Sequence, residues 1–307
     1  MLQYIIKRLL ASFITLFLII TLTFFLMHSI PGGPFTSEKS LSPAVEKALQ
    51  EKYHLNDPVW KQYFDYLASV ARLDLGPSFK YPGVTVNSLI VKGLPVTFKA
   101  GGLAALLVIC LGIPVGVIAA LKHNKWQDSA VMAFATIGIA IPSFVMATIL
   151  LYLFALKLNW FPTFGVRNWN GYVLPVIALS GFWLAFIARL TRSSVLEVLQ
   201  QDYMVVARAK GLFRRQILFK HGLRNALIPI VTMLGPIIAN LMTGSFVIEQ
   251  IFALPGVGKY FVQSISNRDY TTIMGITIFY ASFLILMILV VDLLYLVIDP
   301  RIKLAKK

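Results

Sequence analysis

Charged residues and cysteine are both scarce in this sequence. Only 13% of its 307 residues are Asp, Glu, Lys or Arg, whereas a soluble domain carries about a quarter. The single cysteine, Cys110, excludes a disulfide within the chain, and its place in an apolar run favours the role of a small hydrophobe. Because 58% of the residues are hydrophobic, the composition predicts a helical membrane protein rather than a soluble domain.

Motifs for catalysis and for metal binding are missing as well. The sequence contains no GxxxxGK[ST] phosphate loop, no paired catalytic carboxylates and no Ser/His/Asp set. Its four histidines are too far apart in sequence to give a metal-ligand spacing. We therefore expect a chain that is not an enzyme and that holds no cofactor or metal. Any ATP hydrolysis that drives it would take place in another chain.

Six long uncharged runs predict six transmembrane helices, since about 20 apolar residues cross a ~30 Å hydrocarbon core. The expected spans cover about residues 9–30, 100–121, 129–156, 172–190, 226–250 and 271–297. The first run could be a signal peptide, but it exceeds the ~7–15 residues of a signal core and no cleavage site follows it. We interpret it as a retained span. The third run contains Pro142, which predicts a kink or a tilt.

Lys and Arg are distributed unevenly along the chain, and their placement predicts its orientation. The net charge of +15 could indicate nucleic-acid binding, but these residues lie mostly at the borders of the predicted spans. Most lie near the two termini and in the loop between the fourth and fifth spans. Because cytoplasmic segments carry an excess of Lys and Arg, this favours a cytoplasmic location for both termini. Residues 31–95 would then form an extracytoplasmic segment.

The extracytoplasmic segment contains two helix-start signals, at Ser42-Pro43 and at Asn56-Asp57-Pro58. We expect two short helices packed on the outer face of the membrane. The second start signal precedes an apolar stripe at helical spacing, made of Trp60, Phe64, Leu67 and Ala71.

Small residues recur at helical spacing in the second predicted span. Gly112, Gly116 and Ala120 lie four residues apart, and this spacing lets helix backbones approach closely in a membrane. The ridge could form the seam with a second membrane subunit, or it could pack against another helix of the same chain. The sequence leaves both alternatives open.

Acidic residues are nearly absent from the predicted spans. Glu249 and Gly244 are candidates for a role in the transport pathway or in the structure. For Glu249, an ion pair at the membrane surface with Lys259 or Arg268 is the favoured interpretation. Asp292 is expected to pair with Arg301. A secondary carrier normally needs titratable groups near mid-membrane, so this scarcity counts against that class.

The longest basic interval between two apolar runs is 202–229, which overlaps a predicted cytoplasmic loop at 191–225. Apolar spacing predicts one helix from about Val195 to Lys210, and Gly211 is expected to end it. Lipid anchoring would explain the basic residues alone. The helix–Gly–helix pattern and the apolar pair Leu212-Phe213 favour docking to a protein partner instead.

Several stretches of the chain resemble one family of transport proteins. Residues 205–211 resemble the Glu-Ala-Ala-x-x-x-Gly coupling-loop motif of ATP-binding-cassette (ABC) importer permeases, with valines in place of the Glu and the first Ala. Other stretches are typical of the peptide/nickel branch: YHLNDP (53–58), GPSFKY (76–81), ARAKGL, LRNALIP, GSFVIEQIFALPGVG (244–258), NRDY (267–270) and the 298–300 ending. Because they follow the family's order over the whole chain, the sequence resembles the B-type membrane permease subunits of bacterial oligopeptide ABC importers.

This resemblance implies an all-α integral membrane protein with one transmembrane domain over residues 1–307, six spans and a cytoplasmic coupling helix between spans four and five. It implies a location in the bacterial inner membrane, a C-type permease partner, two ATP-binding subunits that hold ATP and Mg, and an extracytoplasmic peptide-binding protein that delivers oligopeptides. The implied ATPase-coupling residues are Asp202, Ala207, Arg208, Ala209, Lys210, Gly211, Leu212 and Phe213. Alternatives are a dipeptide or nickel permease subunit, a secondary carrier and a membrane scaffold.

Overall fold

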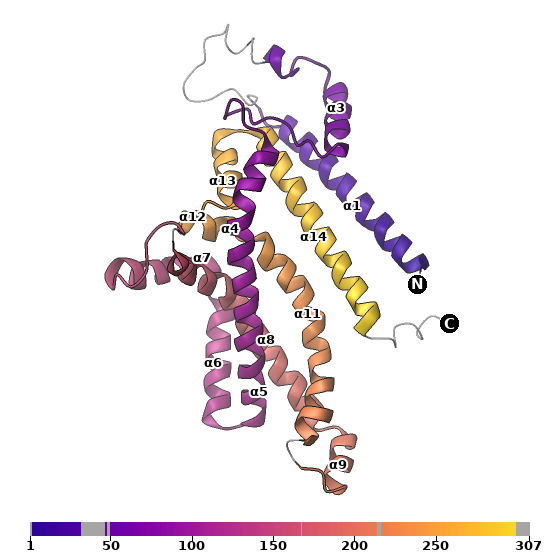
Figure 1. The fold of residues 1–307 in the computed structure, drawn as a ribbon, viewed down its shortest axis with the longest axis vertical. Coiled ribbons are helices and arrows are strands. Elements are labelled where there is room, and N and C mark those ends of the chain that lie inside the picture. The colour runs from indigo at the N-terminus through magenta and orange to yellow at the C-terminus, as the bar shows by residue number, and fades with distance from the viewer. Residues whose placement is uncertain (1, 32–46, 48–49, 167, 214–215, 299–307) are drawn as a thin grey trace. The chain divides into compact units, whose positions relative to one another are not determined.

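The computed structural model is helical almost throughout, and it describes residues 2–31, 47, 50–166, 168–213 and 216–298. Within these ranges the only strand-like pairing is an isolated antiparallel bridge between Pro77 and Thr85. Five helical runs are long and apolar enough to cross a membrane, and a bent helix pair makes a sixth if both halves form one span. The prediction of an all-α membrane protein is confirmed (Figure 1).

The chain divides into two compact units, and each is described by itself. The first consists mainly of Met1–Val96 and Pro255–Val290, and the second mainly of Thr97–Leu254. The boundary falls within helix α4 (Val86–Leu107). The single domain expected over residues 1–307 stays a prediction.

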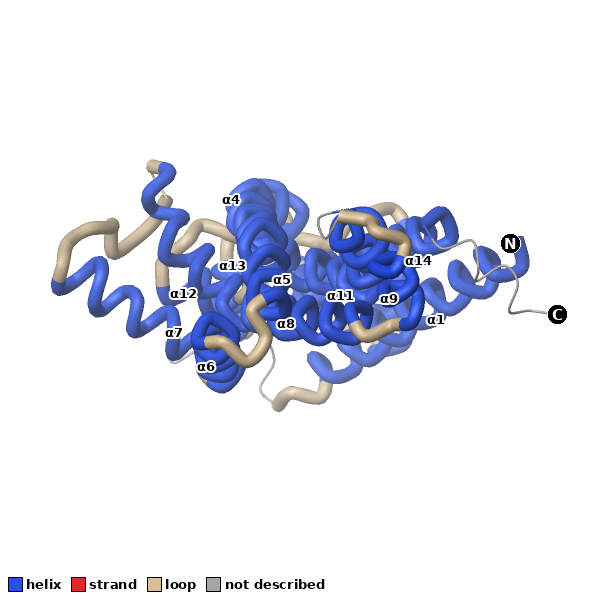
Figure 2. The backbone as a smooth tube through the Cα atoms, turned by 90° about the horizontal axis from the view of Figure 1, so that it is seen from below, coloured by secondary structure: helices blue, strands red, loops and turns tan. Residues whose placement is uncertain are grey.

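Helix α8 (Val173–Leu199) is the centre of the second unit. It packs against α5 (Ile113–Leu121), α6 (Trp126–Ala140), α7 (Ser143–Leu150) and α11 (Arg224–Thr243) (Figure 2). The helix continues past residue 190, the predicted end of this span. Arg189 and Arg192 had marked the end of the apolar run, but both lie inside the helix and donate hydrogen bonds to residues of α6. A charge with a partner does not end a helix.

The small-residue ridge of the second predicted span packs against α8. A Cβ added to Gly116 would lie 2.5 Å from the carbonyl oxygen of Ala188. Ala120 belongs to a buried cluster with Val195 of α8 and Ala226 of α11. Of the two alternatives for this ridge, the structure supports packing within the chain.

The helix that contains the second predicted span begins before that span, within the predicted segment 31–95. Helix α4 starts at Val86 and continues through a π-helical stretch, Val108–Gly112, into α5, so that one helical run covers Val86–Leu121. The predicted start of the span at residue 100 lies inside this helix, because Lys92, Pro95 and Lys99 interrupt the uncharged run without ending the helix. Lys99 Nζ lies over the ring of Tyr172, 4.7 Å from its centroid, which gives the ammonium group a favourable contact.

The third predicted span is broken at Pro142. Helix α6 ends at Ala140, and α7 with its π-helical extension (Leu151–Lys157) leaves at 103° to it. The sequence predicted the place of the interruption correctly, but the break is far larger than a kink or a tilt. Ile141 has the extended backbone that a residue before proline prefers (φ −84°, ψ 120°), and this ends α6.

The fifth and sixth predicted spans differ in continuity. The fifth consists of a π-helical stretch (Ile217–Leu223), α11 and the short α12 (Phe246–Ile251), with a break at Gly244. Helix α13 (Val257–Asn267) follows. Helix α14 (Tyr270–Ile298) matches the sixth predicted span, 271–297. The side chain of Asp292 and residue Arg301, predicted to pair, lie outside the described residues.

In the first unit, helix α3 (Val59–Ala71) packs on the second half of α1 (Leu2–His28). The hydroxyls of Tyr63 and Thr21 are 2.7 Å apart, and the ring of Phe24 contacts that of Tyr63. The prediction of a short helix after Asn56-Asp57-Pro58 is confirmed. The stripe residues Trp60 and Phe64 do not pack on α1, because their side chains are 65% and 61% exposed. The helix start predicted at Ser42-Pro43 lies outside the described residues.

Two of the family-like stretches meet at a buried carboxylate in the same unit. Asp269, from NRDY, is 1% exposed and accepts hydrogen bonds from Ser78 Oγ and the Phe79 amide, both from GPSFKY. The hydroxyls of Thr271 and Thr272 donate to it as well. Asp269 thereby fixes the loop before α4 onto the start of α14.

Candidate functional site

The basic segment of the sequence forms a short separate helix, α9 (Asp202–Ala209). The expected continuous helix from Val195 to Lys210 is wrong, because α8 ends at Leu199 and Gln201 is extended (φ −71°, ψ 146°). Asp202 lies in the first turn, where a carboxylate is favoured by the helix dipole.

Gly211 ends α9 as the sequence predicted. It has φ +76°, a conformation that favours glycine. Its amide donates to the Arg208 carbonyl at 3.0 Å, and the Leu212 amide donates to the Ala207 carbonyl at 3.4 Å. These two bonds form the Schellman arrangement that closes a helix and turns the chain away from it. The end of α9 is therefore fixed by its own backbone.

One side of α9 is anchored to the neighbouring helices. Met204 and Ala207 form a buried cluster with Ile217, and Leu199 packs against it. Asn225 of α11 donates a hydrogen bond to the Tyr203 hydroxyl at 3.0 Å. A displacement of α9 would thus pull on the end of α8 and on the start of α11.

The other side of α9 is open and partly apolar. Seven of the eight predicted coupling residues are exposed: Asp202, Arg208, Ala209, Lys210, Gly211, Leu212 and Phe213. Phe213 is 78% exposed. The eighth, Ala207, faces the buried cluster. Arg214 and Arg215 lie outside the described residues.

Sequence reasoning missed two exposed residues on this helix. Val205 and Val206 are 55% and 52% exposed, although Val206 would lie on the apolar stripe of the single helix expected from Val195 to Lys210. Met204 and Ala207 form the buried stripe instead, with a spacing of three residues. Because the helix is interrupted at Gln200-Gln201, the apolar spacing of α8 does not continue into α9. A sequence analysis that placed this interruption would have predicted Met204 and Ala207 as the buried residues.

The second pair of candidate residues, Gly244 and Glu249, meets at the break between α11 and α12. Gly244 has φ +75° and ψ −175°, and a Cβ there would lie 2.8 Å from Glu249 Oε1. The Thr97 hydroxyl of α4, which sequence reasoning did not select, donates to the same oxygen at 2.8 Å. Glu249 is 2% exposed, so its carboxylate is buried within the protein. The ion pair with Lys259 or Arg268 stays a prediction. The missing side chain of Gly244 leaves room for this carboxylate.

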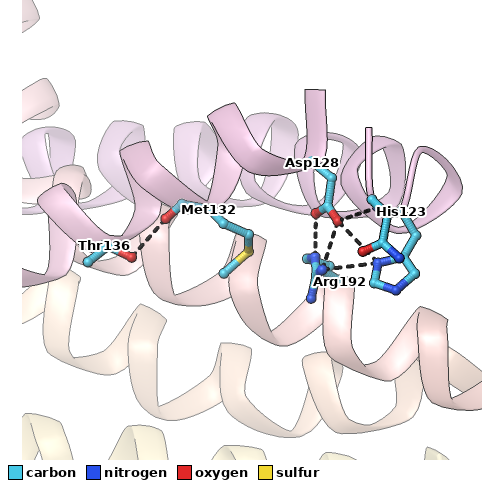
Figure 3. A network of polar contacts seen from close by, with 6 residues as sticks. His123, Asp128, Met132, Thr136 and Arg192 are labelled. Carbon is cyan, nitrogen blue, oxygen red and sulfur yellow. Dashed lines mark hydrogen bonds and ion pairs between the residues drawn. The ribbon is translucent and has the colours of Figure 1, made fainter. Parts of the chain in front are cut away.

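A further charged cluster was missed entirely (Figure 3). Asp128 of α6 is 3% exposed, and Arg192 of α8 donates to both of its oxygens, with a distance of 2.8 Å from Nη2 to Oδ2. The Asn124 amide donates to Oδ2 at 3.1 Å, and His123 Nδ1 lies 3.1 Å from the same atom. The pair ties the α5–α6 turn to α8, seven residues before α8 ends at Leu199. The sequence signal for this cluster was Asp128 itself, a single acidic residue at the border of the apolar run 129–156.

The solved structures that resemble this chain are ABC transporters. One inward-facing form of the MetNI methionine ABC transporter matches 69% of this chain and 96% of its own, with a TM-score of 0.58 and 18% identity. An amino acid ABC transporter solved with histidines matches 68% of this chain and 93% of its own, with a TM-score of 0.54 and 18% identity. At this identity the likeness shows the fold.

Relatives of much higher identity extend over the full length. The dipeptide transport system permease protein DppB of Bacillus subtilis is 50% identical over 307 residues, covering 100% of both chains. The oligopeptide transport system permease protein OppB of Salmonella typhimurium is 47% identical over 308 residues, covering 99% of this chain and 100% of its own. OppB of Escherichia coli is 46% identical with the same coverage.

Two family descriptions match the chain. Residues 1–99 match the N-terminal region of the membrane components of binding-protein-dependent transport systems, and residues 112–304 match their main region. The order of the two matches agrees with the full-length relatives. This chain therefore belongs to the family of inner membrane components of binding-protein-dependent transport systems, among the permease subunits of peptide ABC importers.

Proposed function

We propose that this chain forms half of the translocation path of an ATP-driven importer that moves oligopeptides into the cytoplasm. A C-type permease subunit would form the other half, and an extracytoplasmic binding protein would deliver the peptide. Two ATP-binding subunits would bind ATP and Mg and dock at α9. The chain would lie in the bacterial inner membrane with both termini in the cytoplasm.

The observation that carries this proposal is the two-sided character of α9. One side is anchored by the buried Met204 and Ala207 and by the hydrogen bond between Tyr203 and Asn225 of α11. The open side presents Val205, Val206 and Phe213. Exposed apolar groups beside Arg208 and Lys210 suit a groove on a protein partner. Closure of the ATP-binding subunits would favour the permease state that fits their spacing, because a ligand shifts an equilibrium only through unequal contacts with the two states.

A second substrate class has support from the relatives. The relative from Bacillus subtilis is named as a dipeptide permease, whereas those from Salmonella typhimurium and Escherichia coli are named as oligopeptide permeases. Uptake assays with labelled di- and hexapeptides in a strain that depends on this transporter would distinguish the two classes.

The coupling role is tested by Phe213→Glu and Val206→Glu in the assembled transporter. Both positions are open, so the new carboxylate meets the partner rather than the fold of this chain. We expect each change to reduce peptide uptake and co-purification of the ATP-binding subunits at least about tenfold, as for loss of a central apolar contact. Ala207→Glu is less informative, since it would bury a charge within the α9 cluster.

The matched control is Leu73→Glu. Leu73 is 81% exposed and follows α3, in the segment expected outside the membrane. Leu73→Glu should leave peptide uptake and co-purification of the ATP-binding subunits unchanged. All three variants should still insert into the membrane. Normal uptake and normal co-purification by Phe213→Glu and Val206→Glu would overturn the docking of ATP-binding subunits at α9.

A further inference from the structure

Helix α3 of the first unit has three faces of different character. Gln62, Tyr63 and Tyr66 lie toward α1. A second face carries the charged residues Lys61, Asp65 and Arg72. The third consists of Trp60, Phe64, Leu67 and Ala71, which share a helix face because they are four, three and four residues apart. We call this third set the α3 apolar face.

Hydrogen bonds fix α3 at a definite depth along the first membrane span. The apolar window of that span ends at His28, and Tyr63 reaches the hydroxyl of Thr21. Thr21 lies seven residues before His28, which is about 10 Å along the helix axis. Gln62 contacts His28 itself, with 3.1 Å between Oε1 and Nε2. Helix α3 therefore lies beside the last two turns of the span, where hydrocarbon gives way to headgroups.

The α3 apolar face is continuous with an exposed apolar surface of α1. Around its outer end α1 is largely exposed, with Leu22 and Leu26 both at 61% and Phe25 at 44%. The ring of Phe25 lies 5.3 Å from that of Tyr63, and the ring of Tyr63 lies 5.6 Å from that of Phe64. An aromatic chain thus leads from the surface of the span to the α3 apolar face.

We propose that the α3 apolar face is inserted in the lipid interface, so that α3 is an interfacial helix attached to the first span. Trp and Phe side chains are favoured at this depth, and the charged face of α3 then meets water. Lys61 and Arg72 are offset by Asp65 and by Asp57, the ion-pair partner of Lys61. Aromatic and apolar burial rather than attraction to anionic lipid therefore holds the helix in place. This proposal is independent of the substrate and of the coupling role of α9.

Single-cysteine labelling of the full chain tests this arrangement. Cys110 is exposed and is first replaced (Cys110→Ala). Into this background we introduce Trp60→Cys, Phe64→Cys or, as the matched control on the charged face, Asp65→Cys. Each variant is reconstituted in vesicles of phosphatidylethanolamine and phosphatidylglycerol and treated with a charged maleimide. The reagent needs a thiolate in water, so we expect positions 60 and 64 to react at least about tenfold more slowly than position 65.

The outcomes separate lipid from a protein cover. Slow reaction at 60 and 64 in vesicles holding this chain alone, with equal rates for all three variants after denaturation in dodecyl sulfate, supports the proposal. Equal rates in the vesicles overturn it. Protection that develops only after the other transporter subunits or the binding protein are added also overturns it, since the surface would then be a protein interface. The use of two positions guards against local unfolding caused by the loss of Trp60.

Discussion

Asp128 and Asp269 are two buried carboxylates of the same chain that are satisfied in different ways. They are 3% and 1% exposed, in the second and the first unit respectively. Asp128 is held by the guanidinium of Arg192 (Figure 3). Among the described residues, Asp269 has uncharged donors only: the hydroxyls of Ser78, Thr271 and Thr272 and the amides of Phe79 and Thr272.

The difference teaches how each carboxylate can hold its helices together. A bidentate arginine gives a strong, oriented contact between two helices, but each charge then depends on the other. At Asp269, several neutral donors from a loop and from the start of a helix share the hydrogen bonding of the carboxylate. Loss of any one of them leaves the others in place. Loss of one partner should therefore be far more harmful at Asp128 than at Asp269.

The largest effect is expected for Arg192→Met. This change leaves the Asp128 carboxylate buried without its cation, and breaking a buried ion pair costs about 3–5 kcal/mol. We expect a large fall in the apparent melting temperature of the purified chain in detergent, measured by the heat dependence of its helical circular dichroism.

The double variant Asp128→Leu with Arg192→Met sharpens this test. It removes both charges and fills the site with apolar groups, which is often neutral or stabilising by comparison with the pair itself. We expect most of the lost stability to return, and a double-mutant cycle measures the coupling. If the single variant melts like the wild-type chain, Arg192 is not what satisfies Asp128.

A smaller effect is expected for Asp269→Asn. The amide keeps one accepting oxygen and loses the other, so one or two of the donors must find new acceptors, at a cost of about 1–3 kcal/mol. The change in apparent melting temperature should be clearly smaller than for Arg192→Met. Thr272→Val is the companion variant, since it deletes one donor and leaves the carboxylate with the others. A loss at Asp269→Asn as large as at Arg192→Met would erase the distinction between the two sites.

Features of this chain that depend on a short stretch of sequence were predicted well. Apolar runs located the spans, Gly211 marked the end of α9, and Pro142 marked the break between α6 and α7. Each depends on composition or on the backbone preference of one residue, and both are visible in a short window. The pairing of Gly244 with Glu249 also lies within one stretch, GSFVIE.

Features that depend on contacts between distant residues could not be predicted. Asp128 and Arg192 are 64 residues apart, and each looked like the edge of an apolar run. The start of α4 was missed because Lys92 and Lys99 look like the end of a span until a partner such as Tyr172 is known. The face of α3 that packs on α1 is polar and aromatic, held by Tyr63 and Gln62, and the apolar stripe of α3 does not indicate it.

The smallest effect is expected at the ion pair of Lys61 and Asp57. This pair distinguishes the effect of distance on ion-pair strength from the effect of burial. Lys61 Nζ lies 2.8 Å from Asp57 Oδ2, the same distance as between Arg192 Nη2 and Asp128 Oδ2. The Lys61 and Asp57 side chains are 50% and 28% exposed, however, so water screens them. We expect Lys61→Met to leave the apparent melting temperature at neutral pH unchanged within error, in low and in high salt.

Acid provides the finer test of this surface pair. The hydrogen bond from Lys61 lowers the pKa of the Asp57 carboxyl. A lowered folded pKa stabilises the fold above the unfolded pKa, about 3.9, and the gain is lost as the pH falls through the folded pKa. As the pH is lowered, the apparent melting temperature of Lys61→Met should therefore fall slightly less than that of the wild-type chain. We expect no other difference between the two. A large loss at neutral pH would mean that the distance between the charges, and not their burial, sets the strength of ion pairs in this chain, and it would remove the physical reason for ranking Arg192 first.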